Sequence, residues 1–230
     1  MPTDHRTIVA AQRREKMRRR LIEAATLVIA AKGPDAIVID DIIAEAGVSR
    51  GTFYKYYDTV VEILAEAKQT LGDEMYQLVL DAQSPQEDVA QVIALDMLRF
   101  IATCMRYPLM GQFSAQLGFQ GLGRGNLIHK IGPAMLSHGA KTGCFAAMPQ
   151  NMAIDLLQLG VIALLKRHAE GEEVDPRDMV AALLRLLGVA PDQAALAAAQ
   201  DYAALTAPPD SLIARSDRIR QCAKALPNPA

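Results

Sequence analysis

The sequence predicts an all-α protein, and three observations support this fold class. Strong helix formers, above all Ala and Leu, dominate the composition, and alternating β-branched runs are scarce. Apolar residues make up 51% of the 230 residues, which is ample for a buried core in one or two domains. Pro and Gly residues separate the apolar segments at intervals of helical length.

The first predicted helix runs from about Gln12 to Lys32 and ends at Gly33-Pro34. Its apolar residues recur at helical spacing: Leu21, Ala24, Ala25, Val28 and Ala31. The first 20 residues are strongly basic, although the whole chain has a net charge of −2. They hold seven cations against two carboxylates, a local charge of +5: Arg6, Arg13, Arg14, Lys16, Arg18, Arg19 and Arg20 against Asp4 and Glu15. Such a basic arm suits nucleic-acid phosphates, or else it is a solvated start of a helix.

A helix-turn-helix is predicted over residues 38–57. A second helix begins near Asp40 and ends at Gly47, where glycine accommodates a positive φ at little cost. Ser49 is a natural N-cap for a third helix. In that helix two aromatic residues, four positions apart, point toward a core: Phe53 and Tyr57. The outward face is polar and cationic, as a DNA major groove requires; it comprises Gly51 and Lys55, flanked by Thr52 and Tyr54.

A fourth helix is predicted from Asp58-Thr59 to about Gln83, where Ser84-Pro85 breaks it. Further helical patterns cover about residues 86–106, 126–141, 150–170, 177–188, 192–205 and 209–225. A glycine-rich, flexible connection is expected between residues 111 and 125. It does not predict a phosphate-binding loop, because no strand precedes it and no Gly-Lys-Ser/Thr closes it. We expect two domains, residues 1–58 and 59–230.

The sequence disfavours several classes of protein. Cys104, Cys144 and Cys222 are far apart and odd in number, which indicates buried free thiols in a reducing compartment. No metal-ligand cluster and no nucleophile constellation is present, so we expect no metal, no cofactor and no enzymatic activity. We see neither a signal peptide nor an uninterrupted apolar run of membrane-spanning length, so a cytoplasmic location without a membrane partner is expected.

The basic helix, the helix-turn-helix and the long fourth helix with Ile63-Leu64-Ala65 together resemble the TetR family of bacterial one-component repressors. The resemblance covers about residues 12–66, and its signature is Ala46-Gly47-Val48-Ser49-x-Gly51-x-Phe53-Tyr54-x-x-Tyr57. It implies an N-terminal three-helix DNA-binding domain and a larger helical domain for ligand binding and dimerisation. It also implies contacts to bases and phosphates from the basic arm and the third helix: Arg14, Arg18, Arg50, Gly51, Thr52, Tyr54, Lys55 and Tyr56.

Four positions depart from the family pattern and bear on operator affinity. Val38 stands where a Ser or Thr usually caps the second helix, and Asp40 takes a position that is often cationic or neutral. Ile43 replaces a small Ala, and Val60 replaces a Lys that usually reaches a phosphate. Each lost phosphate contact lowers the salt dependence of DNA binding by roughly one unit.

The resemblance implies an effector pocket in the body of the chain. We expect it between the helices near 86–106, 126–141 and 150–165, with a soft apolar lining. The predicted ligand-binding residues are Met97, Ile101, Cys104, Phe113, Phe119, Met135 and Leu157, and the candidate polar groups are Arg99, Arg106 and His129. The alternative for each apolar residue is an ordinary place in the core.

The resemblance also implies a dimer formed by the helices near 150–170 and 177–188. Both helices have a broad apolar face, which in two subunits would build a four-helix bundle. The predicted interface residues are Leu156, Gly160, Ala163, Leu164, Val180, Leu184 and Leu187. Burial of these residues inside one subunit is the alternative.

These observations predict a ligand-responsive, homodimeric transcriptional regulator, most simply a repressor. It would bind a double-stranded DNA operator and leave it when a small hydrophobic effector enters the body. The alternative is a protein-interaction module that keeps the helix-turn-helix fold with weakened operator recognition, as the departures at Val38, Asp40 and Val60 suggest.

Overall fold

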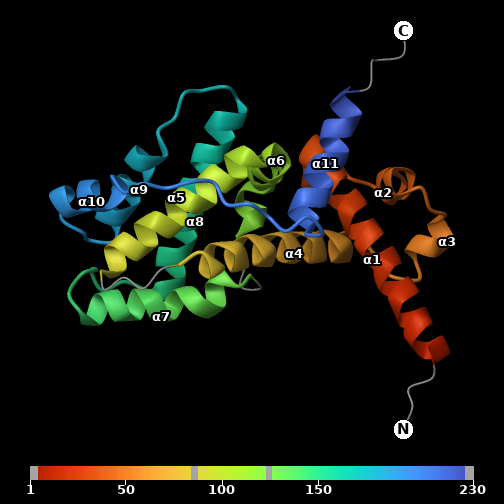
Figure 1. Ribbon diagram of the computed structural model, residues 1–230, viewed down its shortest axis with the longest axis horizontal. Coiled ribbons are helices and arrows are strands. Elements are labelled where there is room, and N and C mark those ends of the chain that lie inside the picture. Colours follow the sequence, from red (N-terminus) through yellow and green to blue (C-terminus); the bar gives the residue numbers. More distant parts are fainter. Residues whose placement is uncertain (1–4, 84–87, 123–125, 226–230) are drawn as a thin grey trace.

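The computed structural model describes residues 5–83, 88–122 and 126–225, and within these ranges the chain is helical without a strand. The predicted all-α fold is therefore confirmed. A small head of three helices is joined by one long helix to a larger helical body (Figure 1). The helices are α1 (His5–Lys32), α2 (Ile39–Ala46), α3 (Arg50–Phe53), α4 (Val60–Asp81), α5 (Val89–Arg106), α6 (Pro108–Leu117), α7 (Ile128–Lys141), α8 (Gln150–Ala169), α9 (Pro176–Leu186), α10 (Pro191–Ala198) and α11 (Leu212–Ala225).

Local capping explains where the helices of the head begin and end. Ser49 accepts a hydrogen bond from the Thr52 backbone N–H at 3.2 Å, which caps α3. Gly47 ends α2 in the left-handed region with φ 59°, as the sequence predicts. The second helix has no capping hydroxyl, because Val38 precedes it; the Asp41 carboxylate accepts the Val38 N–H at 3.2 Å instead.

The long helix α4 connects the head with the body. Two side chains cap its start: Thr59 accepts from the Glu62 N–H at 3.2 Å, and Glu62 accepts from the Asp58 N–H at 2.9 Å. Its buried residues are spaced by four along one face: Ile63, Ala67, Leu71, Met75 and Val79. The predicted domain division after residue 58 stays a prediction, because one cluster of buried residues runs from α1 into the body.

The C-terminal helix α11 returns from the body to the head, where it packs against α1, α4 and α6 (Figure 1). Glu74 of α4 accepts from the first backbone N–H groups of α11, at 3.0 Å from Leu212 and 3.2 Å from Ile213. Arg215 pairs with Glu23 of α1 across 3.3 Å. The helix therefore adds to the contacts that α1 makes with α4 and α6 between head and body.

Three helix predictions differ from the structure. The first helix starts at His5 rather than near Gln12, since no breaker precedes Gln12 within the described residues. The predicted connection after residue 111 is instead α6, with Pro108 at its first turn, followed by a short 3-10 helix (Gly118–Gly121). In α6 the lack of a side chain at Gly111 allows close packing, because a Cβ there would lie 3.1 Å from the Cys104 carbonyl oxygen.

The third difference is at residues 199–205, which were predicted to be helical, whereas α10 ends at Ala198. In this segment backbone N–H groups donate to side-chain hydroxyls of α5 and its C-cap residue, instead of to the backbone carbonyl oxygens of a helix. The Leu205 N–H donates to Thr103 Oγ1 at 2.9 Å, and the Ala207 N–H donates to Tyr107 Oη at 3.0 Å. The predicted break at Ser84-Pro85 and the glycines at 123 and 125 lie outside the described residues.

The three cysteines are free thiols, but they are not all buried. Cys104 is buried and Cys144 is half-buried, whereas Cys222 is exposed on α11. Burial raises the pKa of the Cys104 thiol well above its ordinary value, so this thiol stays protonated. The prediction of buried thiols is therefore wrong for Cys222.

Candidate functional site

The helix pair α2–α3 presents an outward face whose geometry follows from its buried side. Ile42, Ala46 and Phe53 are buried, and the Phe53 ring lies 6.0 Å from that of Tyr57, itself 5% exposed. These contacts turn the remaining side chains of the pair away from the core. Among the predicted DNA contacts, Arg50, Gly51, Tyr54 and Lys55 are exposed, whereas Thr52 and Tyr56 are half-buried.

Two ion pairs occupy the first turn of α2. The Asp40 carboxylate accepts from Arg50 Nη2 at 2.8 Å, and both side chains are more than half exposed. Lys32 Nζ lies 2.5 Å from Asp41 and, with the Val38 N–H, holds the pKa of that carboxyl below its ordinary value. In the described part of the chain no ion pair involves Lys55, which leaves it as an unpaired cation on the outward face.

The basic arm is the first half of α1, which projects beyond the packed part of the head (Figure 1). Arg14 is exposed, as a phosphate contact requires. Arg18 is paired within the subunit: its guanidinium is directed to α4, where Nε lies 2.8 Å from Glu66, and its predicted DNA contact stays a prediction. Arg19 is similarly paired with Glu15 at 3.0 Å. The arm therefore has fewer free cations than its sequence suggests.

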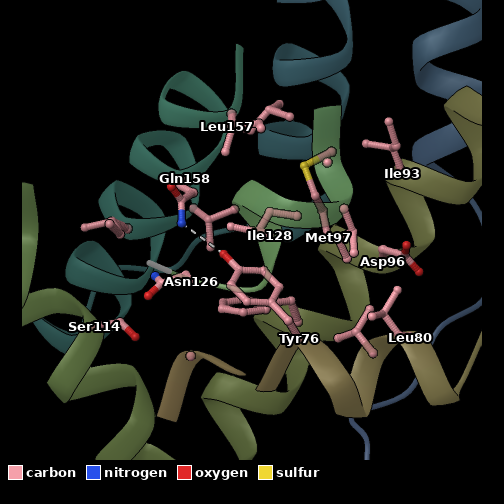
Figure 2. Close-up of a pocket in the computed structure, with 18 of the residues that line it drawn as sticks. Tyr76, Leu80, Ile93, Asp96, Met97, Ser114, Asn126, Ile128, Leu157 and Gln158 are labelled. Atoms are coloured by element: carbon pink, nitrogen blue, oxygen red, sulfur yellow. Dashed lines mark hydrogen bonds between the residues drawn. The ribbon is translucent and has the colours of Figure 1, made fainter. Parts of the chain in front are cut away.

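A cavity of about 170 Å³ lies in the body, bounded by α4, α5, α6, α7 and α8 (Figure 2). Its lining is predominantly apolar and soft. The apolar residues include Val79, Leu80, Ile93, Met97, Phe100, Met110, Phe113, Leu117, Ile128, Ile131, Met135, Leu136, Ile154, Leu157, Val161, Ile162 and Leu165. One of its walls is α4, whose opposite end carries the head.

Two polar side chains meet inside this apolar surface. Gln158 Nε2 donates to Tyr76 Oη at 3.0 Å, and this hydrogen bond joins α8 to α4 at the lining of the cavity (Figure 2). Burial raises the pKa of Tyr76 to about 12, so the phenol keeps its proton as a donor. Gln158 Oε1 is buried without a hydrogen-bond partner in the described structure. An unsatisfied buried acceptor is costly, so this atom favours a ligand that donates a hydrogen bond.

Charged and other polar groups lie at the edges of the cavity. Lys68 Nζ donates to the carbonyl oxygens of Gln120 at 2.7 Å and Leu122 at 3.0 Å, and burial lowers its pKa. Asp96 accepts from Gln83 Nε2 at 2.5 Å, and burial raises its pKa to about 6. Asn126 and Ser114 complete the polar part of the lining.

The raised pKa of Asp96 predicts a pH-dependent stability. Its folded pKa of about 6 exceeds the ordinary 3.8, so its protonation favours the folded state below pH 4 and this contribution is lost as pH rises to 6. Asp96→Asn keeps an acceptor for Gln83 and removes the charge. Relative to wild type, it should gain on the order of 2–3 kcal/mol in unfolding free energy between about pH 4 and about pH 7.

Urea unfolding of both proteins across this pH range measures the difference. The same substitution at exposed Asp201 is the control for the loss of one carboxylate. Parallel pH profiles for wild type and Asp96→Asn would contradict the assignment of the raised pKa to burial.

The structure places four of the seven predicted ligand-binding residues in the cavity lining: Met97, Phe113, Met135 and Leu157. The other three lie elsewhere. Ile101 and Cys104 are 0% exposed in the core, because α6 packs closely over this end of α5. Phe119 follows α6 in the 3-10 helix and is 79% exposed.

None of the three predicted polar groups lines the cavity. Arg99 donates to the Ala82 carbonyl oxygen at 2.8 Å, and Arg106 is exposed. The His129 side chain is only 5% exposed, 3.9 Å from Asp155. Sequence reasoning missed Tyr76 and Gln158, for which the available signal was a polar residue within an apolar helical pattern.

The predicted dimer residues are partly used inside the subunit. Leu164, Val180, Leu184 and Leu187 are buried within the single chain, because α9 packs against α5, α8 and α10. Gly160 serves the same packing, since a Cβ there would lie 2.6 Å from Leu183 Cδ2. Of the predicted set, Leu156 is half-buried and Ala163 is exposed.

Comparisons with known proteins agree with this arrangement. Residues 21–67 match the family model described as bacterial regulatory proteins, tetR family. Two regulators from Pseudomonas putida are similar to parts of the chain. The uncharacterised regulator TtgW is 32% identical over 123 residues, which are 52% of this chain and 85% of TtgW. SrpR is 31% identical over 118 residues, 50% of this chain and about half, 52%, of SrpR.

Solved structures have the same fold. RolR in complex with resorcinol matches 85% of this chain and 100% of its own with a TM-score of 0.68 at 24% identity, and ligand-free RolR gives 0.65. The fold and the outward helix pair therefore define a helix-turn-helix transcriptional regulator. The chain belongs to the TetR family. Its relatives are DNA-binding regulators rather than enzymes.

Among the described helices, none combines the length and apolarity needed to cross a membrane.

Proposed function

We propose that this regulator is a homodimeric repressor that leaves its operator when a small, largely apolar effector enters the cavity between α4 and α8. The supporting observation is the position of α4. Its body end supplies Tyr76, Val79 and Leu80 to the cavity, and its other end follows directly on the helix-turn-helix. A ligand that displaces this helix therefore moves the head.

The mechanism is a change in the spacing of two heads. In a dimer, two recognition helices reach successive major grooves only when they lie about 34–36 Å apart. An effector that prefers a different spacing shifts the population by its differential affinity. A preference of about 100-fold corresponds to about 2.7 kcal/mol, and a complete reversal of a 99:1 population needs about 10⁴-fold, or about 5.5 kcal/mol.

The dimer would use the apolar side chains of α8 and α9 that remain outside the core. Met152 is 55% exposed on α8, and Leu186 is 46% exposed on α9. Together with Leu156 and Ala163 they are candidates for a surface repeated on both subunits, as two-fold symmetry requires.

The effector that fits best is a single aromatic ring carrying a hydroxyl group. A cavity of about 170 Å³ is comparable to a dry engineered cavity of about 150 Å³ that binds benzene. The buried Gln158 Oε1 needs a donor, and the protonated Tyr76 hydroxyl can donate to the ligand oxygen. The complex of RolR with resorcinol, a dihydroxybenzene, is consistent with this chemistry.

Operator binding and release test the proposal. The chain should form a specific, salt-sensitive complex with a DNA duplex selected from a random pool, with two chains per site by light scattering. Resorcinol, as the probe, should dissociate the complex, whereas benzene should do so less effectively. A chain that prefers no duplex at any salt concentration would refute a regulatory role through DNA.

A second candidate is a protein-interaction module with weakened operator recognition. It is supported by two donors that could meet phosphates but are bound within the chain. The Val38 N–H donates to Asp41, and the Arg50 guanidinium pairs with Asp40. Val60→Lys, which restores a cation at the start of α4, separates the candidates. If DNA binding appears only in this variant, the native function lies elsewhere.

A further inference from the structure

The Asp40–Arg50 pair lies at the edge of the outward face of the head. Asp40 is the second residue of α2, and Arg50 is the first residue of α3. The 2.8 Å contact between Arg50 Nη2 and Asp40 Oδ1 therefore bridges the first turns of both helices. Since both side chains are more than half exposed, the pair contributes little to stability.

The pair changes what Arg50 can recognise. A phosphate attracts a guanidinium mainly through its charge, and the adjacent Asp40 carboxylate cancels that charge. The guanidinium has five N–H donors, of which the carboxylate uses the Nη2 edge. The remaining donors can still meet the O6 and N7 acceptors of a guanine in the major groove. The Asp40 carboxylate therefore weakens the binding of Arg50 to a phosphate more than its hydrogen bonds to a guanine base.

Other cations of the head support the same division of labour. Arg13 and Arg14 are exposed on the basic arm, and no ion pair among the described side chains involves either of them. These cations are available to attract the DNA backbone, so Arg50 is not the head's only source of general affinity.

We propose that Asp40 is a specificity-determining positioning residue, which holds the Arg50 guanidinium across the α2–α3 junction so that it reads a guanine edge instead of a phosphate. This inference rests on the proposed operator binding. Without the carboxylate, Arg50 would regain its full charge and pair with the nearest phosphate of any sequence.

The test compares Asp40→Asn with a matched control, Glu45→Gln. Glu45 is exposed on the same helix, and its substitution makes the same change in net charge without touching Arg50. Fluorescence anisotropy measures binding to the selected operator duplex and to a scrambled duplex over a range of salt concentrations. Asp40→Asn should bind the scrambled duplex more tightly, with a salt slope steeper by about one unit. Its preference for the operator should fall about tenfold through the lost guanine contact.

Further outcomes decide the role of Asp40. Asp40→Glu should restore part of the preference, because the longer carboxylate can still reach Arg50. Equal shifts for Asp40→Asn and Glu45→Gln would mean a bulk charge effect and would overturn the inference. Weaker binding to both duplexes with a lower melting temperature would mean a structural role and would also overturn it. A wild-type chain without preference for any duplex would refute operator binding itself, before Asp40 is tested.

Discussion

Lys55→Glu should reduce operator affinity by at least about 100-fold, because it replaces an attractive contact with repulsion at the DNA surface. Lys55 is exposed on the outward face of the helix pair and forms no ion pair among the described residues. The fold should be unaffected, since the side chain supports no buried contact. Anisotropy titration with the operator duplex measures the loss, and thermal unfolding checks the fold.

Lys130→Glu is the matched control for this prediction. Lys130 is exposed on α7 in the body, so its substitution makes the same change in net charge at a site away from the head. Equal losses from both variants would show that the affinity follows net charge alone. A further comparison assigns the type of contact: Lys55→Ala and Thr52→Ala should alter sequence preference, whereas Tyr54→Phe should weaken all sequences equally.

Leu157→Trp should abolish the response to the effector and leave operator binding intact. Leu157 lines the cavity of about 170 Å³, and the added indole atoms would occupy the space that a single aromatic ring needs. The effector concentration for half-release should rise at least about 100-fold, as expected when several kcal/mol of ligand contacts are lost. Effector-induced release from the operator duplex measures this change.

Two further variants keep the cavity prediction testable. Leu196→Trp makes the same substitution at a side chain that is 69% exposed on α10, and it should respond like wild type. Gln158→Met preserves volume but removes the buried Oε1 acceptor, so it should weaken a hydroxylated ligand more than benzene. If release by resorcinol survives in both Leu157→Trp and Gln158→Met, the effector binds outside this cavity.

Local rules explain why the head could be predicted in detail. The turn at Gly47, the cap at Ser49 and the inward pair Phe53 and Tyr57 each depend on residues within a few positions of one another. A capping hydroxyl or a left-handed glycine acts on its own backbone, so the sequence suffices. The same holds for Thr59, which caps α4.

The cavity could be predicted only in part, because side chains from five helices build it. Helical spacing identified Met97 on α5 and Leu157 on α8 as inward residues, but it could not separate cavity from core. Ile101 and Cys104 share the face of Met97, and they are buried because α6 packs against their end of α5. That helix was itself missed, since a proline begins it and a run of glycines follows it, so the segment resembles a connection.

The sequence by itself determined the all-helical fold, the helix-turn-helix and the family, because caps, turns and apolar periodicity act over short distances along the chain. Only the tertiary structure decided which groups meet across long distances. It brought Gln158 to Tyr76, paired Asp40 with Arg50, and buried Leu164 and Val180 within one subunit. The physical reason is that a helical face shows which side chains turn inward, whereas the packing of one helix on another selects the partner they find there.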